Sequence, residues 1–334
     1  MTAGEIEALF QPWANARTVL LAVSGGPDSM ALLHLAARWA GTPGRPSLYA
    51  ATVDHGLRPE APAEAELVEA AAAHLKIPHQ TLNWQGEKPK TGMQEAARQV
   101  RYDLLLALAE DIGADVVMTA HHADDQAETI LFRLLRGSGL AGLSGIKSES
   151  RRGEIKLARP LLPLRKSQLV VVCNVANQPF VDDPSNRDEK YARTSLRNLL
   201  TQLELLDLGA PDWTRLGARL ERADQALAQA AQAAGERARA RAENSATPES
   251  LDYTRIVAES EEIRIRVIAH TLETAGARLP LALEKLENLC DSLQNAARKS
   301  TALGTTLGGL QIRLSKEGLL TCSKEGARRR GLTG

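Results

Sequence analysis

The sequence of 334 residues contains few cysteines and few aromatic residues. Its 3 cysteines, Cys173, Cys290 and Cys322, are odd in number and far apart, so they suggest neither a disulfide framework nor a cysteine-based metal cage. No apolar run approaches the length needed to span a bilayer, and the first residues are polar and acidic, unlike a signal peptide. We therefore expect a protein of the cytoplasm, with no membrane association.

The chain also lacks net charge, since 41 Lys and Arg balance 41 Asp and Glu. A neutral chain is not a globally basic binder of nucleic acid. Basic residues are nevertheless concentrated in residues 133–166, here called the basic run. This segment contains nine Lys and Arg but only two acidic residues, Glu149 and Glu154. Such a run is usually a solvated face, and contact with nucleic acid is the alternative.

The length of the chain exceeds that of one typical domain. An apolar content of 43% with 25% charged residues is that of a globular protein. Composition changes near residues 208–211, and an Ala-, Gln- and Arg-rich stretch follows. We predict a first domain over 1–210 and a smaller, mostly helical second domain over 211–334, with a short C-terminal β-hairpin and no catalytic constellation.

Short apolar runs in the first domain alternate with helical patterns. The runs 19–23, 48–53, 79–84 and 116–119 predict buried strands. Alternation of this kind predicts an α/β fold with a doubly wound, Rossmann-like parallel sheet, covered on both faces. Ligands of such sheets bind beyond the carboxyl ends of the strands. The polar segments 24–29, 54–58 and 121–129 all follow strands, so we expect them to form the active site.

The segment Ser24-Gly25-Gly26-Pro27-Asp28-Ser29 joins the first strand to a helix. Its glycines allow close approach of a ligand, and backbone N–H groups before a helix N-terminus bind phosphate. The segment matches neither the Walker P-loop nor the dinucleotide fingerprint. A plain strand-to-helix turn is the alternative. Asp28 is the nearest carboxylate for a magnesium ion, although an acid at this position also stabilises a helix dipole.

Two carboxylates, Asp125 and Glu128, are three residues apart and share one helix face. Such a pair can bind an ammonium group, bind a metal or act as a base. His121 and His122 either make hydrogen bonds at the helix start or take part in chemistry. A divalent-metal hydrolase is also conceivable from this cluster, but a complete ligand set is not evident in the sequence.

The loop resembles the S-G-G-x-D-S loop of the N-type ATP pyrophosphatases, the PP-loop superfamily. Within that superfamily, further stretches resemble the tRNA(Ile)-lysidine synthases, and their order in the chain is the same. These stretches are Val53–Arg58, Ala97–Tyr102, Thr119–Thr129, Arg133–Gly139, Arg159–Leu162 and Asp183–Asn186. Together the blocks span roughly residues 18–200, which makes the resemblance specific.

The resemblance implies an ATP-dependent ligase that forms a C–N bond. Members of the family join L-lysine to C2 of the wobble cytidine in the CAU anticodon of tRNA(Ile), which changes decoding from AUG to AUA. The C2 oxygen first attacks the α-phosphate of ATP and releases pyrophosphate; a lysine amine then displaces AMP. The implied cofactors are ATP and Mg²⁺, and a homodimer is the assembly that we consider.

The resemblance also implies roles for individual residues. For ATP binding they are Ser24, Gly25, Gly26, Pro27, Asp28, Ser29, Asp54 and His55, with Asp28 also on the metal. The implied catalytic residues are Asp28, Arg101, Asp125, Glu128 and Arg193, of which Asp125 and Glu128 hold lysine. In the basic run, the residues assigned to tRNA backbone phosphates are Arg133, Arg136, Arg151, Arg152 and Arg159.

Two other functions compete with this one. A tRNA thiolase of the same superfamily would usually need Cys-x-x-Cys pairs or a catalytic cysteine near the site, and neither is present. A non-catalytic module that binds nucleotide or RNA would keep the loop without needing Asp125 and Glu128. Longer members of the family carry an additional C-terminal tRNA-binding domain. The sequence therefore does not show which residues would bind the body of the tRNA.

Overall fold

The structure, a computed structural model, describes residues 1–89, 91–181, 192–239, 250–279 and 281–325, with the side chains of 192–194 excepted. The chain divides into two compact units. Unit 1 comprises Met1–Gly137 and Gly142–Ala218, and unit 2 comprises Ser138–Ala141 and Arg219–Gly334. The boundary near Ala218 falls inside helix α9 (Ala210–Arg239).

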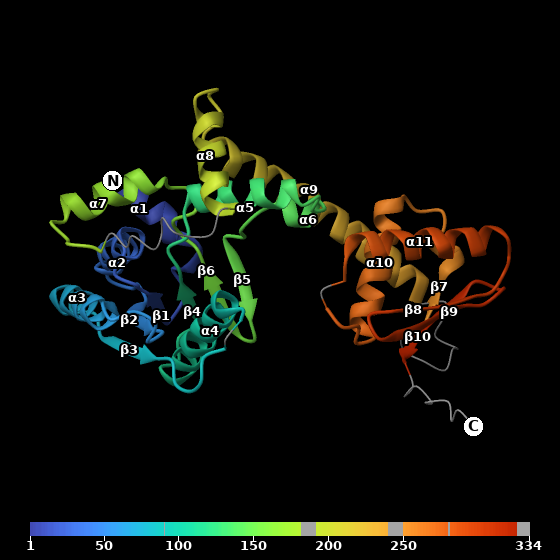
Figure 1. Cartoon of the computed structure of the whole chain (residues 1–334), viewed down its shortest axis with the longest axis horizontal. Helices are drawn as coiled ribbons and strands as arrows, with labels where there is room; N and C mark the ends of the chain where they lie inside the picture. Colours follow the sequence, from blue (N-terminus) through green and yellow to red (C-terminus); the bar gives the residue numbers. More distant parts are fainter. Residues whose placement is uncertain (90, 182–191, 240–249, 280, 326–334) are drawn as a thin grey trace. The chain divides into compact units, whose positions relative to one another are not determined.

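A six-stranded sheet forms the centre of unit 1, with strand order β3-β2-β1-β4-β6-β5 (Figure 1). Its strands are β1 (Thr18–Ala22), β2 (Ser47–Asp54), β3 (His79–Asn83), β4 (Val116–Met118), β5 (Glu149–Arg152) and β6 (Ile155–Ala158). All neighbours pair in parallel except β5 and β6. The chain order reverses beside β1, so β1 and β4 flank the switch point where α/β sheets bind ligands. The predicted doubly wound α/β fold is confirmed.

Helices cover both faces of this sheet because apolar side chains of the strands point to both of them. Val19, Leu21 and Met118 face a core built with helices α1, α2, α3 and α7. Leu20 and Val117 face the opposite core, which α4 closes. The helices of unit 1 include α1 (Ala3–Phe10), α2 (Pro27–Ala40), α3 (Ala61–His74), α4 (Met93–Asp111), α5 (Ala123–Leu135), α7 (Lys166–Val175) and α8 (Ala192–Glu204). The short helix α6 spans Leu140–Leu143.

The hairpin β5–β6 is a feature that the sequence pattern did not predict. It lies inside the basic run, whose charges gave no strand signal. In β6, Ile155 and Leu157 are buried, while Lys156 between them pairs with Glu149 at 3.7 Å. The alternation of apolar and charged residues is that of a strand, but it extends over only four residues.

Unit 2 combines helices with a four-stranded antiparallel sheet of order β7-β10-β9-β8. The strands are β7 (Leu251–Asp252), β8 (Leu303–Leu307), β9 (Leu310–Leu314) and β10 (Leu319–Lys324). Helices α10 (Glu261–Thr274) and α11 (Leu283–Arg298) and the second half of α9 share one apolar core with this sheet. The predicted C-terminal hairpin is therefore part of a larger sheet, because β7 joins it from residues before α10.

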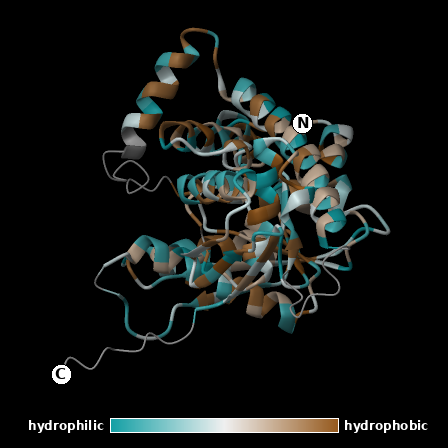
Figure 2. Cartoon of the chain, turned by 90° about the vertical axis from the view of Figure 1, so that its right-hand side faces the viewer, coloured by the Kyte–Doolittle hydropathy of each residue, from teal (hydrophilic) through white to brown (hydrophobic). Residues whose placement is uncertain are grey.

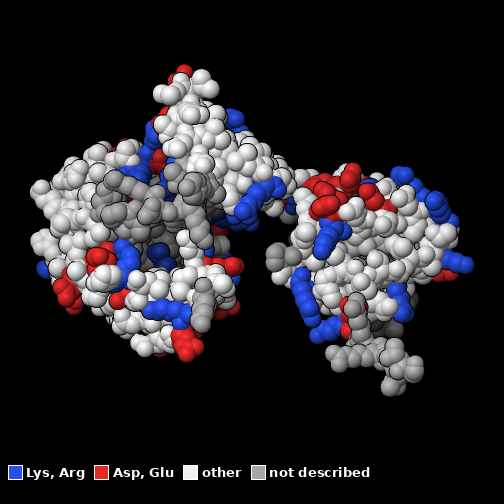
Figure 3. Space-filling model, viewed as in Figure 1, with Lys and Arg blue, Asp and Glu red and all other residues white. Residues whose placement is uncertain are grey.

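Hydrophobic and hydrophilic residues alternate along the helices, as expected for helices that bury one face (Figure 2). Among the described residues, no helix is long and apolar enough to cross a membrane. Lys, Arg, Asp and Glu are mixed over the visible face of the molecule, in keeping with the zero net charge (Figure 3).

Candidate functional site

The loop between β1 and α2 is closed by its own serines. Ser29 is buried; its hydroxyl accepts a hydrogen bond from the Ser24 N–H at 3.0 Å and donates one to the Gly26 carbonyl, also at 3.0 Å. Gly26 caps α2, and Pro27 occupies the first turn, where no N–H is needed. Ser29 therefore shapes the loop from behind, and the ligand-facing groups are the backbone amides at a helix N-terminus.

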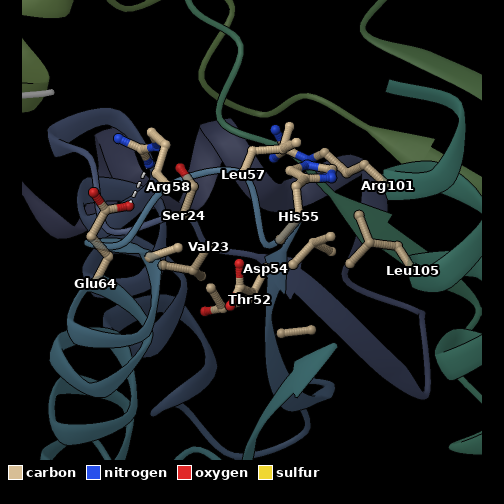
Figure 4. Close-up of a pocket in the computed structure, with 14 residues that line it drawn as sticks. Val23, Ser24, Thr52, Asp54, His55, Leu57, Arg58, Glu64, Arg101 and Leu105 are labelled. Atoms are coloured by element: carbon tan, nitrogen blue, oxygen red, sulfur yellow. Dashed lines mark hydrogen bonds and ion pairs between the residues drawn. The ribbon is translucent and has the colours of Figure 1, made fainter. Parts of the chain in front are cut away.

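One pocket, here called the strand-end pocket, opens on the β1–β2 side of this loop and has a volume of about 310 Å³. Figure 4 shows its lining, with His55 and Arg101 close together and Arg58 joined to Glu64. Asp54 closes a turn by accepting the Gly56 N–H at 2.7 Å. The predicted ATP residues Ser24, Asp54 and His55 all line this pocket.

Arg101 reaches the same pocket from helix α4. Its guanidinium forms no ion pair with any side chain in the described part of unit 1, and burial lowers its pKa, with Arg98 adding to the shift. Burial also lowers the pKa of His55, and Arg101 lowers it further. A half-buried cation with no acidic partner among the described residues favours an anionic ligand.

A second pocket, here called the acidic pocket, has a volume of about 690 Å³ and is lined by Pro27 and Asp28 of the loop. Asp124, Asp125 and Glu128 of α5 line it as well. The predicted catalytic residues thus divide between two pockets that flank the loop: Arg101 lies in one, and the carboxylates lie in the other. Arg193 belongs to α8, but its side chain lies outside the described residues, as does the whole predicted motif 183–186.

His122 lies at the centre of the acidic pocket. Its ring nitrogens are 3.5 Å from Asp28, 3.4 Å from Asp124 and 3.6 Å from Asp125. Burial opposes a charge on this ring, but the carboxylates outweigh burial and raise the pKa of His122 to about 10. The imidazolium therefore holds three like charges together. The sequence left the role of His122 open, and the only signal for it was its place directly after a strand.

Asp125 keeps a raised pKa in spite of this neighbour. Burial is the main cause, and Asp28 and Glu128 contribute, while His122 opposes the shift. The Asp125 carboxylate also accepts the backbone N–H of His122 at 3.0 Å, which fixes it at the start of α5. A carboxylate with a raised pKa is the better proton acceptor of a pair.

His121 points away from the acidic pocket because the backbone at His122 is extended (φ −132°, ψ −179°), and successive side chains then face opposite sides. The His121 ring shares a hydrogen bond of 2.8 Å with the Thr119 hydroxyl. Burial, together with Arg159 and Arg101, lowers the pKa of His121 to about 3. This ring is neutral in the folded protein.

The His121 environment predicts a loss of stability in acid. Below pH 6.5 the unfolded chain takes up a proton that the folded ring accepts only near pH 3, so stability falls with pH over this window. We expect the free energy of unfolding to fall less between pH 7 and pH 5 in His121→Asn, measured by urea denaturation. An identical fall in both proteins would contradict the assignment.

The five arginines of the basic run do not share one environment. Arg133 donates to the carbonyls of Gly142 at 2.7 Å and Gly145 at 2.9 Å. Arg159 is only 9% exposed and donates to the Lys147 carbonyl at 2.9 Å. These two guanidinium groups bind backbone carbonyls of the protein, whereas the other three arginines are exposed. The exposed residues are Arg136, Arg151 and Arg152.

Gln126 anchors the glycine-rich loop that precedes the hairpin. Its amide contacts the Ser144 and Ile146 carbonyls at 3.3 and 3.2 Å, and its Oε1 accepts the Ile146 N–H. Gly145 lies against this amide with φ +79°, where a Cβ atom would come within 2.5 Å of Gln126. Helix α5 thus carries carboxylates on one side and holds this loop with another.

The sheet order, the loop and its two pockets define a PP-loop nucleotide-binding protein, and residues 2–204 match the PP-loop domain family. The chain is 44% identical to the tRNA(Ile)-lysidine synthase of Rhodopseudomonas palustris, covering 96% of this chain and 94% of that protein. The enzyme of the same name from a Methylobacterium strain is 45% identical, covering 96% and 93%. The chain belongs to the tRNA(Ile)-lysidine synthase family.

Among solved structures, the U34-tRNA thiolase NcsA of Methanococcus maripaludis is similar in fold. Its TM-score is 0.56 at 17% identity, covering 66% of this chain and 77% of that one. This likeness concerns the fold alone. In unit 1 the cysteine is Cys173, which donates to the Pro27 carbonyl at 3.3 Å, and burial raises the pKa of its thiol to about 11. A reactive cysteine shows the opposite shift.

Two adjacent glycines of the loop provide a matched pair of variants. Gly25 has φ +83°, whereas Gly26 has φ −72°, which any residue adopts. We expect Gly25→Ala to lower the free energy of unfolding by about 1–2 kcal/mol and to weaken ATP binding, because the loop must shift. For Gly26→Ala, the nearest atom of the described residues lies 4.0 Å from the new methyl group, so we expect wild-type stability. Urea denaturation and ATP titration test this; equal destabilisation by both would contradict it.

Proposed function

We propose that this chain joins L-lysine to C2 of the wobble cytidine in the CAU anticodon of tRNA(Ile), with ATP converted to AMP and pyrophosphate. One observation supports the reaction best: the loop between β1 and α2 lies between a pocket that contains Arg101, which pairs with no described acidic side chain of unit 1, and a pocket lined by five carboxylates. A polyanion suits the first pocket and an amine suits the second. The family to which the chain belongs supplies the identity of the substrates.

In the first proposed step, the cytidine C2 oxygen attacks the α-phosphate of ATP, and the bond to pyrophosphate breaks. The amides of Gly25 and Gly26 and of the α2 N-terminus hold phosphate oxygens, and the loop itself consists of Ser24, Gly25, Gly26, Pro27 and Ser29. Arg101 stabilises charge that develops during the transfer. Asp54 and His55 form the wall of the same pocket, and we keep Arg193 as a further phosphate ligand on the family pattern alone.

In the second proposed step, a lysine amine attacks C2, the C2–O bond breaks and AMP leaves. Asp125 and Glu128 bind the amine from one face of α5, because residues three apart lie on the same side of a helix. The attacking nitrogen must lose a proton. Asp125 receives it, since the pKa of its carboxylate is raised by partial burial and by the neighbouring Asp28 and Glu128.

Asp28 is the candidate ligand for Mg²⁺. Its Oδ1 atom is buried and has no hydrogen-bond partner among the described groups, while Oδ2 faces His122. No group of three His, Cys, Asp or Glu among the described residues is arranged to hold a metal ion alone. Mg²⁺ commonly binds through one or two carboxylates together with substrate phosphates, so this donor set fits. The ion would neutralise phosphate charge.

We assign tRNA backbone contacts first to Arg136, Arg151 and Arg152, whose guanidinium groups are exposed. Arg133 and Arg159 support the same region by holding the glycine-rich loop and the hairpin. We also propose that the second domain, predicted over 211–334, binds tRNA or another substrate. Because its proposed substrates include ATP and tRNA, we propose that the enzyme acts in the cytoplasm. We also propose a homodimer, which light scattering in solution tests.

The decisive experiment incubates the protein with ATP, labelled lysine and unmodified tRNA(Ile) bearing a CAU anticodon. We expect nucleoside mass analysis to find one lysine added per wobble cytidine, with AMP and pyrophosphate in equal amounts. A tRNA with the anticodon cytidine replaced by uridine serves as the control. Absence of the lysine adduct in a preparation that binds ATP and tRNA would contradict the proposal.

A further inference from the structure

Glu128 is already paired in this structure. Arg197 of α8 donates its Nε–H to Glu128 Oε1 at 2.6 Å across the acidic pocket. The Glu128 side chain is 20% exposed and the Arg197 side chain 45% exposed. Both residues line the pocket, one from each of two packed helices. No role for Arg197 follows from the motifs, since its position is separated from Glu128 by 69 residues.

The charges in the pocket show why this pair matters. His122 lies within 3.6 Å of three carboxylates, those of Asp28, Asp124 and Asp125. Glu128 is the fourth carboxylate of this wall, and its ion pair is with Arg197 instead. The two carboxylates of the proposed amine site therefore have different basic neighbours, His122 beside Asp125 and Arg197 on Glu128. Like charges on one helix face repel, so Glu128 without Arg197 would turn away from Asp125.

The helix that carries Arg197 is itself fixed on α5. Leu196, the preceding residue, is buried in an apolar cluster with Ala127 and Ile130 of α5 and Trp213 of α9. Arg165, which precedes α7, also pairs with Glu204 of α8 at 2.5 Å. The Arg197 backbone is thus anchored, and its side chain can define the position of the Glu128 carboxylate.

We propose that Arg197 is a positioning residue for the lysine amine. By holding Oε1 of Glu128, it leaves Oε2 as the atom that binds the incoming ammonium group beside Asp125. A carboxylate accepts several hydrogen bonds, so the arginine and the amine bind it together. This inference rests on the proposed function, because it names the residue that orders the proposed amine site.

The test compares steady-state lysine dependence in wild type, Arg197→Gln and Arg197→Lys at saturating ATP and tRNA. We expect Arg197→Gln to raise the KM for lysine by about tenfold, since a hydrogen bond to a charged group is lost. The KM for ATP and lysine-independent pyrophosphate release should stay at wild-type values. Arg197→Lys keeps the charge and should recover part of the loss.

A double-mutant cycle shows whether the effect passes through Glu128. If Arg197 acts by positioning that carboxylate, then Arg197→Gln adds nothing to the KM for lysine in a Glu128→Gln background. Additive effects would overturn the proposal, because Arg197 would then act independently of Glu128. An unchanged KM for lysine in Arg197→Gln would overturn it as well.

Arg45→Gln is the matched control, since Arg45 also pairs with a glutamate, Glu7, at 2.6 Å, and neither residue lines the acidic pocket. It should leave all constants unchanged. Thermal unfolding of each variant identifies misfolding; if Arg197→Gln unfolds, Arg197→Lys in the same cycle replaces it. If the wild-type enzyme transfers no lysine, the proposed function and this inference both fail. If the wild-type enzyme transfers lysine and Arg197→Gln has the same KM for lysine, this inference alone fails.

Discussion

Replacement of Asp125 by asparagine is expected to slow lysine transfer by about a thousandfold, a typical contribution of a positioned general base. Asparagine has the size of aspartate and can still accept the backbone N–H of His122. It cannot bind an ammonium group through charge or accept a proton. Pyrophosphate release in the absence of lysine should continue, because that step belongs to the strand-end pocket. Rapid quench with separation of adenylated and lysine-bearing tRNA measures both steps.

The stability of this variant provides a second readout. Asparagine keeps the hydrogen bond from the His122 N–H, so the melting temperature should stay close to that of wild type. Asp103→Asn, which alters an exposed carboxylate that accepts from Gln99 on α4, is the control and should transfer lysine normally. Wild-type transfer by Asp125→Asn would remove Asp125 from the mechanism.

Replacement of Arg101 by glutamine is expected to slow the first step by about 10²- to 10³-fold, the usual cost of losing one donor that stabilises transition-state charge. The guanidinium has no acidic partner in the described part of the pocket, so its removal costs no ion pair. We therefore expect the free energy of unfolding to stay close to that of wild type, because Arg101 is only partly buried. Pyrophosphate release in a single turnover and calorimetric unfolding measure the two effects.

Arg98→Gln is the matched control for this prediction. Arg98 lies on the same helix one turn before Tyr102, is exposed and has its guanidinium 5.4 Å from the Tyr102 ring. It should change the rate of pyrophosphate release only slightly. A loss of stability in Arg101→Gln without a loss of rate would show that Arg101 supports the fold and does not contact phosphate.

The fold of unit 1 followed from the sequence because its four parallel strands are short apolar runs with polar segments behind them. Strands β1 to β4 lie where those runs predict them. The hairpin β5–β6 was missed because its pairing depends on contacts with β4 and not on local hydrophobicity. Charge density alone likewise did not distinguish Arg136, which is exposed, from Arg159, which is buried against backbone carbonyls.

Several residues that line the two pockets could be named from the sequence, but their arrangement in space could not. Asp125 and Glu128 could be paired on the helix because their spacing is local. The contact between His122 and Asp28 joins two strand ends, and that between Arg197 and Glu128 joins two helices, so no spacing in the sequence encodes either. Asp54 and His55 were assigned to ATP by resemblance, and they line the strand-end pocket.

The extended backbone at His122 turns the side chains of His121 and His122 to opposite sides of the chain. The His121 ring lies within the influence of the Arg101 charge, and the His122 ring contacts the carboxylates. Side chains alternate along an extended chain. One residue inserted before His122 would therefore turn its ring away from the carboxylates. The length of this short connection from β4 to α5 is therefore as strictly constrained as the identity of its residues. Loops elsewhere in the domain can vary in length without exchanging a neutral ring for a charged one.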